Sequence, residues 1–118
     1  MREARILVVE DEPLVALDFA AVLQDEGYQV IGPARSTDHA LDIIGRRTRL
    51  DGALIDIHLP GGTVDPVAEA LQQRGVRFAF VTGSGHEAVP ERFREAPLIQ
   101  KPCRLADLLK AVEHLRSH

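Results

Sequence analysis

Short apolar runs alternate with amphipathic stretches along the whole chain. Continuous β-branched and aliphatic runs of this kind are typical of strands buried on both faces of a parallel sheet. The expected strands are residues 5–9, 28–32, 53–55, 76–81 and 98–100. Because strands and helices alternate, the strands should pair in parallel through right-handed crossovers. We therefore expect an α/β fold, a doubly wound five-stranded parallel sheet with helices on both faces; the flavodoxin-like order 2-1-3-4-5 is a common one for five strands.

Helical spacing and capping residues predict where the main helices lie. Ser36 or Thr37 is expected to cap the second helix and Thr63 the third, while Gly27 and Gly75 end the first and third helices. The expected inward faces are Ala16, Phe19, Ala20 and Leu23; Thr37, Ala40, Leu41 and Ile44; Val64, Val67, Ala68 and Leu71; and Leu105, Leu108, Leu109 and Val112.

Residues 86–96 carry no helical stripe of two turns. Pro90 interrupts this segment, and its apolar residues are few. A short helix from about Glu91 to Arg94 is the most that the pattern supports. The fourth helix is therefore expected to be short or irregular.

Length and composition narrow the class of protein. The 118 residues suit one domain, residues 1–118, and 45% hydrophobic with 27% charged residues is typical of a globular core. The apolar runs are too short to span a bilayer, and a net charge of −4 offers no basic surface for nucleic acid. A single cysteine, Cys103, suits a reducing compartment. We therefore expect a cytoplasmic domain with no direct nucleic-acid or membrane contact.

Chemically active residues stand at the carboxyl ends of four expected strands. Glu10 and Asp11 follow the first strand, Asp56 the third, Thr82 the fourth and Lys101 the fifth. By itself Asp56 is more simply interpreted as a loop-capping carboxylate. Since parallel strands end at one edge, in the crevice where such sheets bind ligands, we expect these five side chains to meet there.

This set of side chains suggests phosphoryl chemistry. Clustered carboxylates are costly unless a cation joins them, and Mg²⁺ prefers hard oxygen ligands. Lys101 and Thr82 are suited to hold phosphoryl oxygens, and Asp56 would be the nucleophile that forms an acyl phosphate. That modification would add about −1.5 to −2 charges at one point.

Four short motifs at strand ends carry a family resemblance. They are Val8-Val9-Glu10-Asp11-Glu12-Pro13, Ile55-Asp56-Ile57-His58-Leu59-Pro60-Gly61, Val81-Thr82-Gly83 and Lys101-Pro102. With these motifs the chain resembles, along its full length, a two-component response-regulator receiver domain. The resemblance implies phosphorylation of Asp56 by a sensor histidine kinase or a histidine phosphotransfer protein. It also implies Mg²⁺ bound by Glu10, Asp11, Asp56 and the backbone carbonyl of His58, a cis peptide before Pro102, and a signalling rather than an enzymatic role.

A narrower resemblance involves the fourth strand. Residues 77–84 and 90–93 are similar to the "FAT GUY" receivers, whose hallmark reads Pro-Phe-x-Phe-Ala-Thr-Gly-Tyr. Arg77, Val81 and Ser84 depart from that hallmark. Members of this group tend to be single-domain proteins with a reduced or mobile fourth helix.

Several residues receive separate interpretations. Leu98 stands three residues before Lys101, where most receivers carry Tyr or Phe, so we expect the loop from Gly83 to Ala96 to carry the switch instead. Glu12 is interpreted mainly as first-turn helix electrostatics. His58 is interpreted as a solvated loop histidine. The alternative is that it faces the phosphoryl pocket and alters the rate of hydrolysis.

Other functions remain open from the sequence. A receiver-like scaffold would bind an unidentified downstream protein without phosphorylation. A haloacid-dehalogenase-type phosphatase would need a second Asp two residues after the nucleophile, where His58 stands. An FMN module would need a phosphate cradle after the first strand, where Glu10-Asp11-Glu12 would repel phosphate. A phosphorylated receiver, in turn, could be a stand-alone regulator, a phosphate shuttle, a phosphate sink or part of a longer chain.

Overall fold

The strands form one parallel sheet with the expected order. The structure, a computed structural model, describes residues 3–46, 48–83 and 88–116. Within them the five strands are ordered β2-β1-β3-β4-β5. They are β1 (Arg5–Val9), β2 (Gln29–Ala34), β3 (Gly52–Asp56), β4 (Phe78–Thr82) and β5 (Leu98–Gln100). The predicted doubly wound, flavodoxin-like fold is confirmed.

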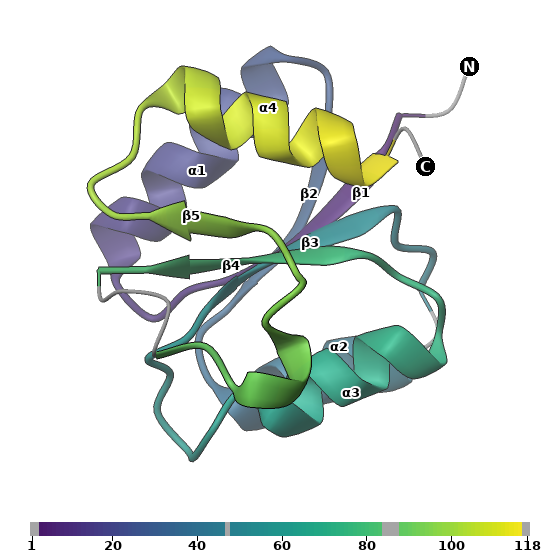
Figure 1. Ribbon diagram of the computed structural model, residues 1–118. Coiled ribbons are helices and arrows are strands. Elements are labelled where there is room, and N and C mark those ends of the chain that lie inside the picture. Colours follow the sequence, from purple (N-terminus) through teal and green to yellow (C-terminus); the bar gives the residue numbers. More distant parts are fainter. Residues whose placement is uncertain (1–2, 47, 84–87, 117–118) are drawn as a thin grey trace.

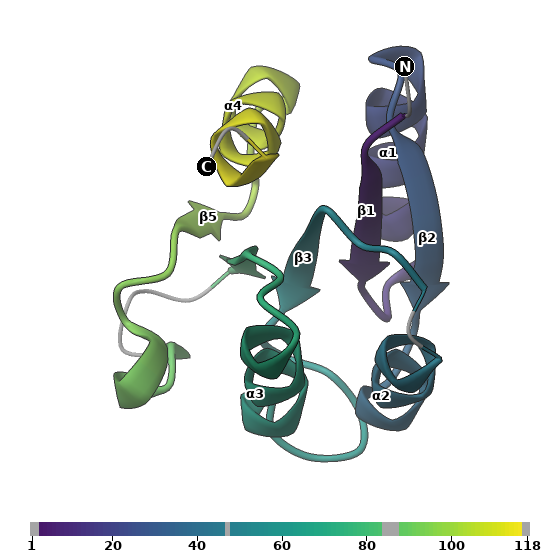
Figure 2. The same ribbon diagram turned by 90° about the vertical axis from the view of Figure 1, so that its right-hand side faces the viewer.

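Helices cover both faces of this sheet (Figure 1). Helices α1 (Pro13–Asp25) and α4 (Leu105–Arg116) lie on one face, and α2 (Thr37–Gly45) and α3 (Asp65–Gln73) lie on the other. The view turned by 90° separates these layers (Figure 2). Among the described helices, none is both long and apolar enough to cross a membrane.

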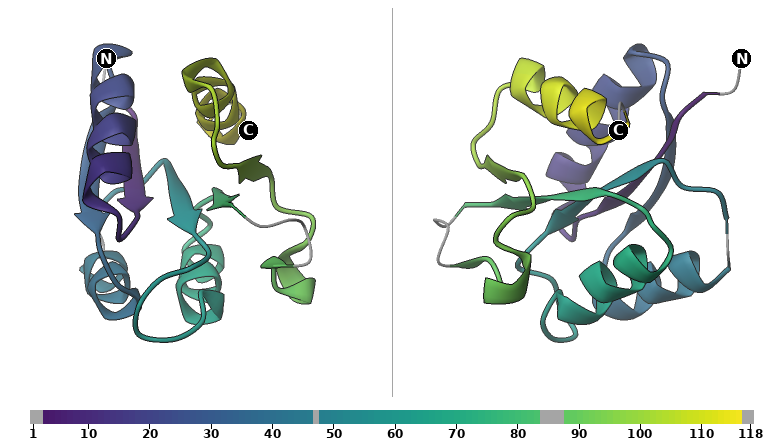
Figure 3. Two further views of the ribbon diagram at one scale, coloured as in Figure 1. Left: turned by 90° about the vertical axis from the view of Figure 1, so that its left-hand side faces the viewer. Right: turned by 45° about the vertical axis from the view of Figure 1, so that its right-hand side comes forward.

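The predicted short fourth helix is a single 3-10 turn. This turn, η2 (Glu91–Phe93), lies on the same side of the sheet as α3 (Figure 3). Its Phe93 is 3% exposed and packs edge-on against Phe78, with ring centroids 6.0 Å apart. The burial of this aromatic side chain anchors the turn against the sheet. Residues 86–87 of the segment that we expected to be irregular, and residues 84–87 of the loop expected to carry the switch, lie outside the described residues.

Each face of the sheet has its own hydrophobic core. Successive residues of a strand point to opposite faces, so Leu7 and Val9 of β1 pack toward α2 and α3, while Ile6 and Val8 pack toward α1 and α4. β3 is buried along its whole length. Its last residue, Asp56, thus lies at the end of a strand that is covered on both sides.

Local signals in the sequence correctly placed several helix ends. The Ser36 hydroxyl accepts a hydrogen bond from the backbone N–H of His39 at 3.1 Å, so Ser36 is the N-cap of α2. Gly27 and Gly75 follow α1 and α3 with φ of 88° and 70°, the left-handed conformation that glycine adopts without a Cβ penalty.

Two predicted helix positions were wrong. The N-cap of α3 is Val64, not Thr63, and it makes no side-chain cap hydrogen bond. Val64 is 1% exposed, so burial of its side chain decides where the helix begins. Leu105 does not face the core but is 54% exposed, and the buried face of α4 begins at Leu108.

The bounds of β2, β3 and β4 also differ from those predicted, those of β3 by one residue at each end. β2 begins at Gln29 and continues to Ala34, through a cis peptide between Gly32 and Pro33 that the sequence did not indicate. β4 begins at Phe78 rather than at residue 76. The cis peptide predicted between Lys101 and Pro102 is present.

Candidate functional site

The sheet register brings the predicted site residues to one edge. Val9 of β1 pairs with Ile55 of β3, so the residues that follow them, Glu10 and Asp56, are neighbours. Thr82 is the last residue of β4. Glu10 is 1% exposed, Asp56 4% and Thr82 0%. These polar side chains are therefore buried at the carboxyl edge, as the sequence predicted for this part of the sheet.

Backbone hydrogen bonds beyond the strands hold these residues in place. The N–H of Glu10 donates to the carbonyl of Ala34 at 2.9 Å, and the N–H of Lys101 donates to the carbonyl of Thr82 at 2.7 Å. Hydrogen bonds to neighbouring strands thus fix the backbone of Glu10 and Lys101, and with it the position from which each side chain extends into the site.

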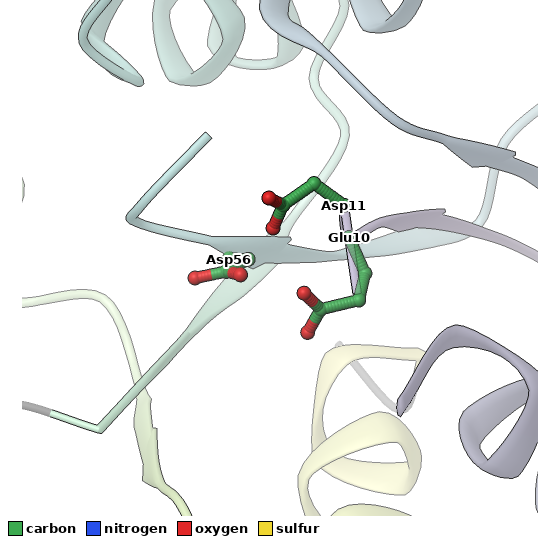
Figure 4. Close-up of side chains that lie close together, drawn as sticks. All are labelled: Glu10, Asp11 and Asp56. Carbon is green, nitrogen blue, oxygen red and sulfur yellow. The ribbon is translucent and has the colours of Figure 1, made fainter. Parts of the chain in front are cut away.

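Three carboxylates converge at this edge (Figure 4). One oxygen from each of Glu10, Asp11 and Asp56 lies within 4.8 Å of the others. The backbone N–H of His58 donates to Asp56 Oδ1 at 3.0 Å, and the N–H of Glu12 donates to Glu10 Oε2 at 3.2 Å. This set of hard oxygen donors, partly buried and close together, fits a Mg²⁺ ion. The role expected for the carbonyl of His58 stays a prediction.

Lys101 supplies the cation among these carboxylates. Its Nζ lies 2.8 Å from Glu10 Oε1 and 3.5 Å from Asp56 Oδ2. It also lies 3.3 Å from Glu12 Oε1, a contact that the sequence did not indicate. Glu12 was interpreted as helix electrostatics, and that interpretation missed its partner. The one signal available was that Glu12 shares the loop after the first strand with Glu10 and Asp11.

Burial and like charge shift the titration of this cluster. Burial, and then the neighbouring carboxyl of Asp56, raise the pKa of Glu10 to about 7. For Lys101, burial acts to lower the pKa, but the contacts with Glu10, Asp56 and Glu12 outweigh it and hold the pKa above its usual value. The ammonium is thus kept charged, while the carboxyl of Glu10 stays protonated to a higher pH than an exposed glutamate would.

Two open cavities border the site. One, of about 720 Å³, lies between the loop after β3 and the η2 segment, with Asp11, His58 and Arg94 in its wall. The other, of about 360 Å³, lies between α1 and the residues after Lys101, with Phe19 in its wall. One cavity thus borders Asp11 and the other borders Lys101.

The remaining singled-out residues lie around this edge. The side chain of His58 is exposed, as expected for a loop histidine. Leu98 is partly buried and packs against the core on the α2 and α3 face. Cys103 packs against the core on the α1 and α4 face, and burial raises the pKa of its thiol, as expected for a small packing residue.

The family follows from a match to a known domain. The model of the response regulator receiver domain matches residues 6–113. The chain belongs to this family. The resemblance predicted from the strand-end motifs is therefore confirmed, while the narrower single-domain subgroup stays a prediction.

Curated receiver proteins are similar over most of this chain. It is 38% identical over 111 residues to the phyllosphere-induced regulator PhyR of Methylorubrum extorquens. The alignment covers 87% of this chain and 40% of PhyR. It is also 28% identical over 113 residues to the transcriptional regulatory protein PdtaR of Mycobacterium tuberculosis. That alignment covers 92% of this chain and 55% of PdtaR. The chain thus spans about half the length of these relatives.

Solved receiver structures share the whole fold. The BeF3-activated conformation of SdrG from Pseudomonas melonis matches with a TM-score of 0.81 and 36% identity over 98% of this chain and 99% of SdrG. A response regulator receiver protein from Sinorhizobium medicae matches with a TM-score of 0.85 and 23% identity, over 98% of this chain and 96% of that chain. The second likeness concerns the fold alone.

Proposed function

We propose that this receiver domain accepts a phosphoryl group on Asp56 from a partner histidine kinase or histidine phosphotransfer protein, in a Mg²⁺-dependent reaction. The observation that carries the proposal is the surroundings of Asp56. Its carboxylate is 4% exposed, lies within 4.8 Å of oxygens from Glu10 and Asp11, and is 3.5 Å from the Lys101 ammonium. A nucleophile placed between a cation site and an ammonium is equipped for phosphoryl transfer.

The chemistry assigns a separate role to each group. An oxygen of Asp56 attacks the phosphorus of a phosphohistidine, the new O–P bond forms as the N–P bond breaks, and the imidazole nitrogen takes a proton from water. Mg²⁺ held by Glu10, Asp11, Asp56 and the His58 carbonyl would supply charge neutralisation at the phosphoryl oxygens. Lys101 and Thr82 orient those oxygens, Lys101 as an ammonium donor and Thr82 through its hydroxyl.

The product is a signal rather than a released molecule. The added charge stays on Asp56 and changes how nearby elements contact a downstream protein. Similarity to SdrG, which adopts a BeF3-activated conformation, supports this role, since BeF3 has the shape and charge of a phosphoryl group. The domain acts in the cytoplasm as a stand-alone regulator, a phosphate shuttle or a phosphate sink, or as the receiver of a longer chain.

Intact-mass analysis tests the proposal directly. The protein is treated with acetyl phosphate or a histidine kinase, with and without Mg²⁺. We expect one phosphoryl adduct that requires Mg²⁺ and disappears in Asp56→Asn. An unmodified wild-type protein would favour the phosphorylation-independent scaffold instead, and an adduct that persists in Asp56→Asn would remove Asp56 as the acceptor.

A further inference from the structure

Three carboxylates surround the ammonium of Lys101, and they differ sharply in exposure. Nζ lies 2.8 Å from Glu10, 3.3 Å from Glu12 and 3.5 Å from Asp56. The side chains of Glu10 and Asp56 are 1% and 4% exposed, whereas that of Glu12 is 63% exposed. The hydrogen bonds of the ammonium go to Glu12 and Asp56, and Glu10 is held beside it as a close ion pair.

Glu12 is not committed to the helix that it precedes. It stands at the N-cap of α1, but its side chain makes no cap hydrogen bond. Pro13 follows at the first helical position, and proline has no N–H that needs an acceptor. The carboxylate of Glu12 instead reaches Lys101, 89 residues later in the sequence. Its contact in this structure is therefore with the site, not with the helix end.

Only one partner of Lys101 can be released at low cost. A phosphoryl group on Asp56 would bring new oxygens that compete for the ammonium protons. Without a metal ion beside it, withdrawing the ammonium from ionised Glu10 would leave a buried carboxylate unpaired, which is expensive. Glu12 is exposed, so water can replace the ammonium around its carboxylate, and exposed pairs contribute little to stability.

On the basis of the proposed function, we propose that Glu12 is a positioning residue for Lys101. In the unphosphorylated protein Glu12 holds the ammonium toward the start of α1, and it releases the ammonium when a phosphoryl group is present on Asp56. Glu12 thus competes with the phosphoryl group for Lys101. Removing this competition should make the site bind a phosphoryl-like anion more tightly.

Lysine-selective NMR tests the resting contact without metal or phosphate. The only lysines are Lys101 and Lys110, and Lys110 is exposed, so the Nζ spectrum holds one reporter and one internal control. In Glu12→Gln the Lys101 Nζ resonance should move while the Lys110 resonance stays in place. The matched variant Glu26→Gln, at the exposed far end of α1, should move neither. An unmoved Lys101 resonance in Glu12→Gln would overturn the proposal.

Binding of beryllofluoride with Mg²⁺ tests the release. Loss of an exposed pair worth about 0.2–1 kcal/mol corresponds to an affinity about 1.4- to fivefold higher for Glu12→Gln than for wild type. Glu12→Asp, which keeps the charge but shortens the reach, should also bind more tightly than wild type, and Glu26→Gln should match wild type. If Glu12→Asp binds beryllofluoride as wild type does, the effect of Glu12→Gln comes from net charge alone, and the proposed role of the Glu12 contact with Lys101 is wrong.

The wild-type protein separates this inference from the proposed function. If wild type binds beryllofluoride and is phosphorylated on Asp56, but Glu12→Gln has the same affinity, only the role of Glu12 is wrong. If wild type takes up neither beryllofluoride nor a phosphoryl group, the proposed function fails first. The Lys101 resonance is then still a direct measure of the Glu12 contact.

Discussion

The burial of Glu10 is the residue-scale feature with the clearest physical consequence. Its carboxylate is 1% exposed and faces a second buried carboxylate, that of Asp56. Burial raises its pKa from 4.5 to about 7. Without a divalent cation, the carboxyl of Glu10 therefore loses its proton at a higher pH in the folded protein than in the unfolded chain.

This proton predicts how stability depends on pH. Between about pH 4.5 and pH 7 the folded state binds more protons than the unfolded state, so the free energy of unfolding contributed by Glu10 falls as the pH rises. In chelator, thermal unfolding should occur several degrees lower at pH 8 than at pH 5.5, and Mg²⁺ at pH 8 should recover the loss because it binds the folded state.

Glu10→Gln is the control for this prediction. The amide keeps the size of the side chain but cannot ionise, so the variant should be more stable than wild type at pH 8 in chelator and should gain less from Mg²⁺. If the unfolding temperature depends on pH in the same way in wild type and Glu10→Gln, another group is responsible for the pH dependence.

At the scale of elements, the exposed apolar side chains are concentrated beside the site. Among the described residues, the large hydrophobic side chains that remain exposed are Leu14 and Leu17 of α1 and Leu105 of α4, at 77%, 64% and 54%. Leu105 also lines the cavity of about 360 Å³ that reaches Lys101. Apolar side chains beside a reaction edge suit the docking of a helical partner.

Docking on this surface predicts a difference between two phosphoryl donors. Leu14→Ser together with Leu17→Ser should slow phosphotransfer from a histidine kinase by about tenfold or more, since each lost apolar anchor is worth about 1 kcal/mol or more. Phosphorylation by acetyl phosphate, which needs no docking surface, should keep its rate. The exposed pair Asp25→Asn and Glu26→Gln on the same helix is the control. Equal loss with both donors would indicate damage to the site rather than to docking.

At the scale of the whole molecule, the question is how the site reaches a partner. The usual aromatic residue before the lysine is replaced by Leu98, which packs beside the core that includes Phe80 and Phe93. Phe93 ties η2 to β4 through this core, with the ring of Phe80 6.3 Å away. Thr82 ends β4, so the site and η2 are joined through one strand and one aromatic cluster.

This connection predicts a change in amide exchange. With beryllofluoride and Mg²⁺, protection should rise in residues 88–96, because engagement of Thr82 would be transmitted through β4 and its aromatic contacts to η2. Helix α2, which lies beside β2 at the opposite edge of the sheet, serves as the reference that should stay unchanged. The same protection with and without the phosphoryl mimic in residues 88–96 would contradict a switch in this segment.

Patterns along the sequence were enough to predict the fold class and most of the candidate site. Apolar runs that alternate with helical stripes leave a parallel sheet as the economical solution, and parallel strands all end at one edge. Glu10, Asp11, Asp56, Thr82 and Lys101 could be placed together for that reason, without any knowledge of their contacts. Strong local signals, such as the Ser36 cap and Gly27, were equally readable because they act within a few residues.

Features that depend on packing between distant parts of the chain could not be predicted from the sequence. The contact between Glu12 and Lys101 joins residues far apart in the sequence, and no local pattern marks it. Burial of Val64 overrode the cap expected at Thr63, and the position of α4 relative to the sheet left Leu105 exposed. In each case the stabilising contacts come from residues that are distant in the sequence. The sequence therefore shows which residue is present but not which residue it contacts.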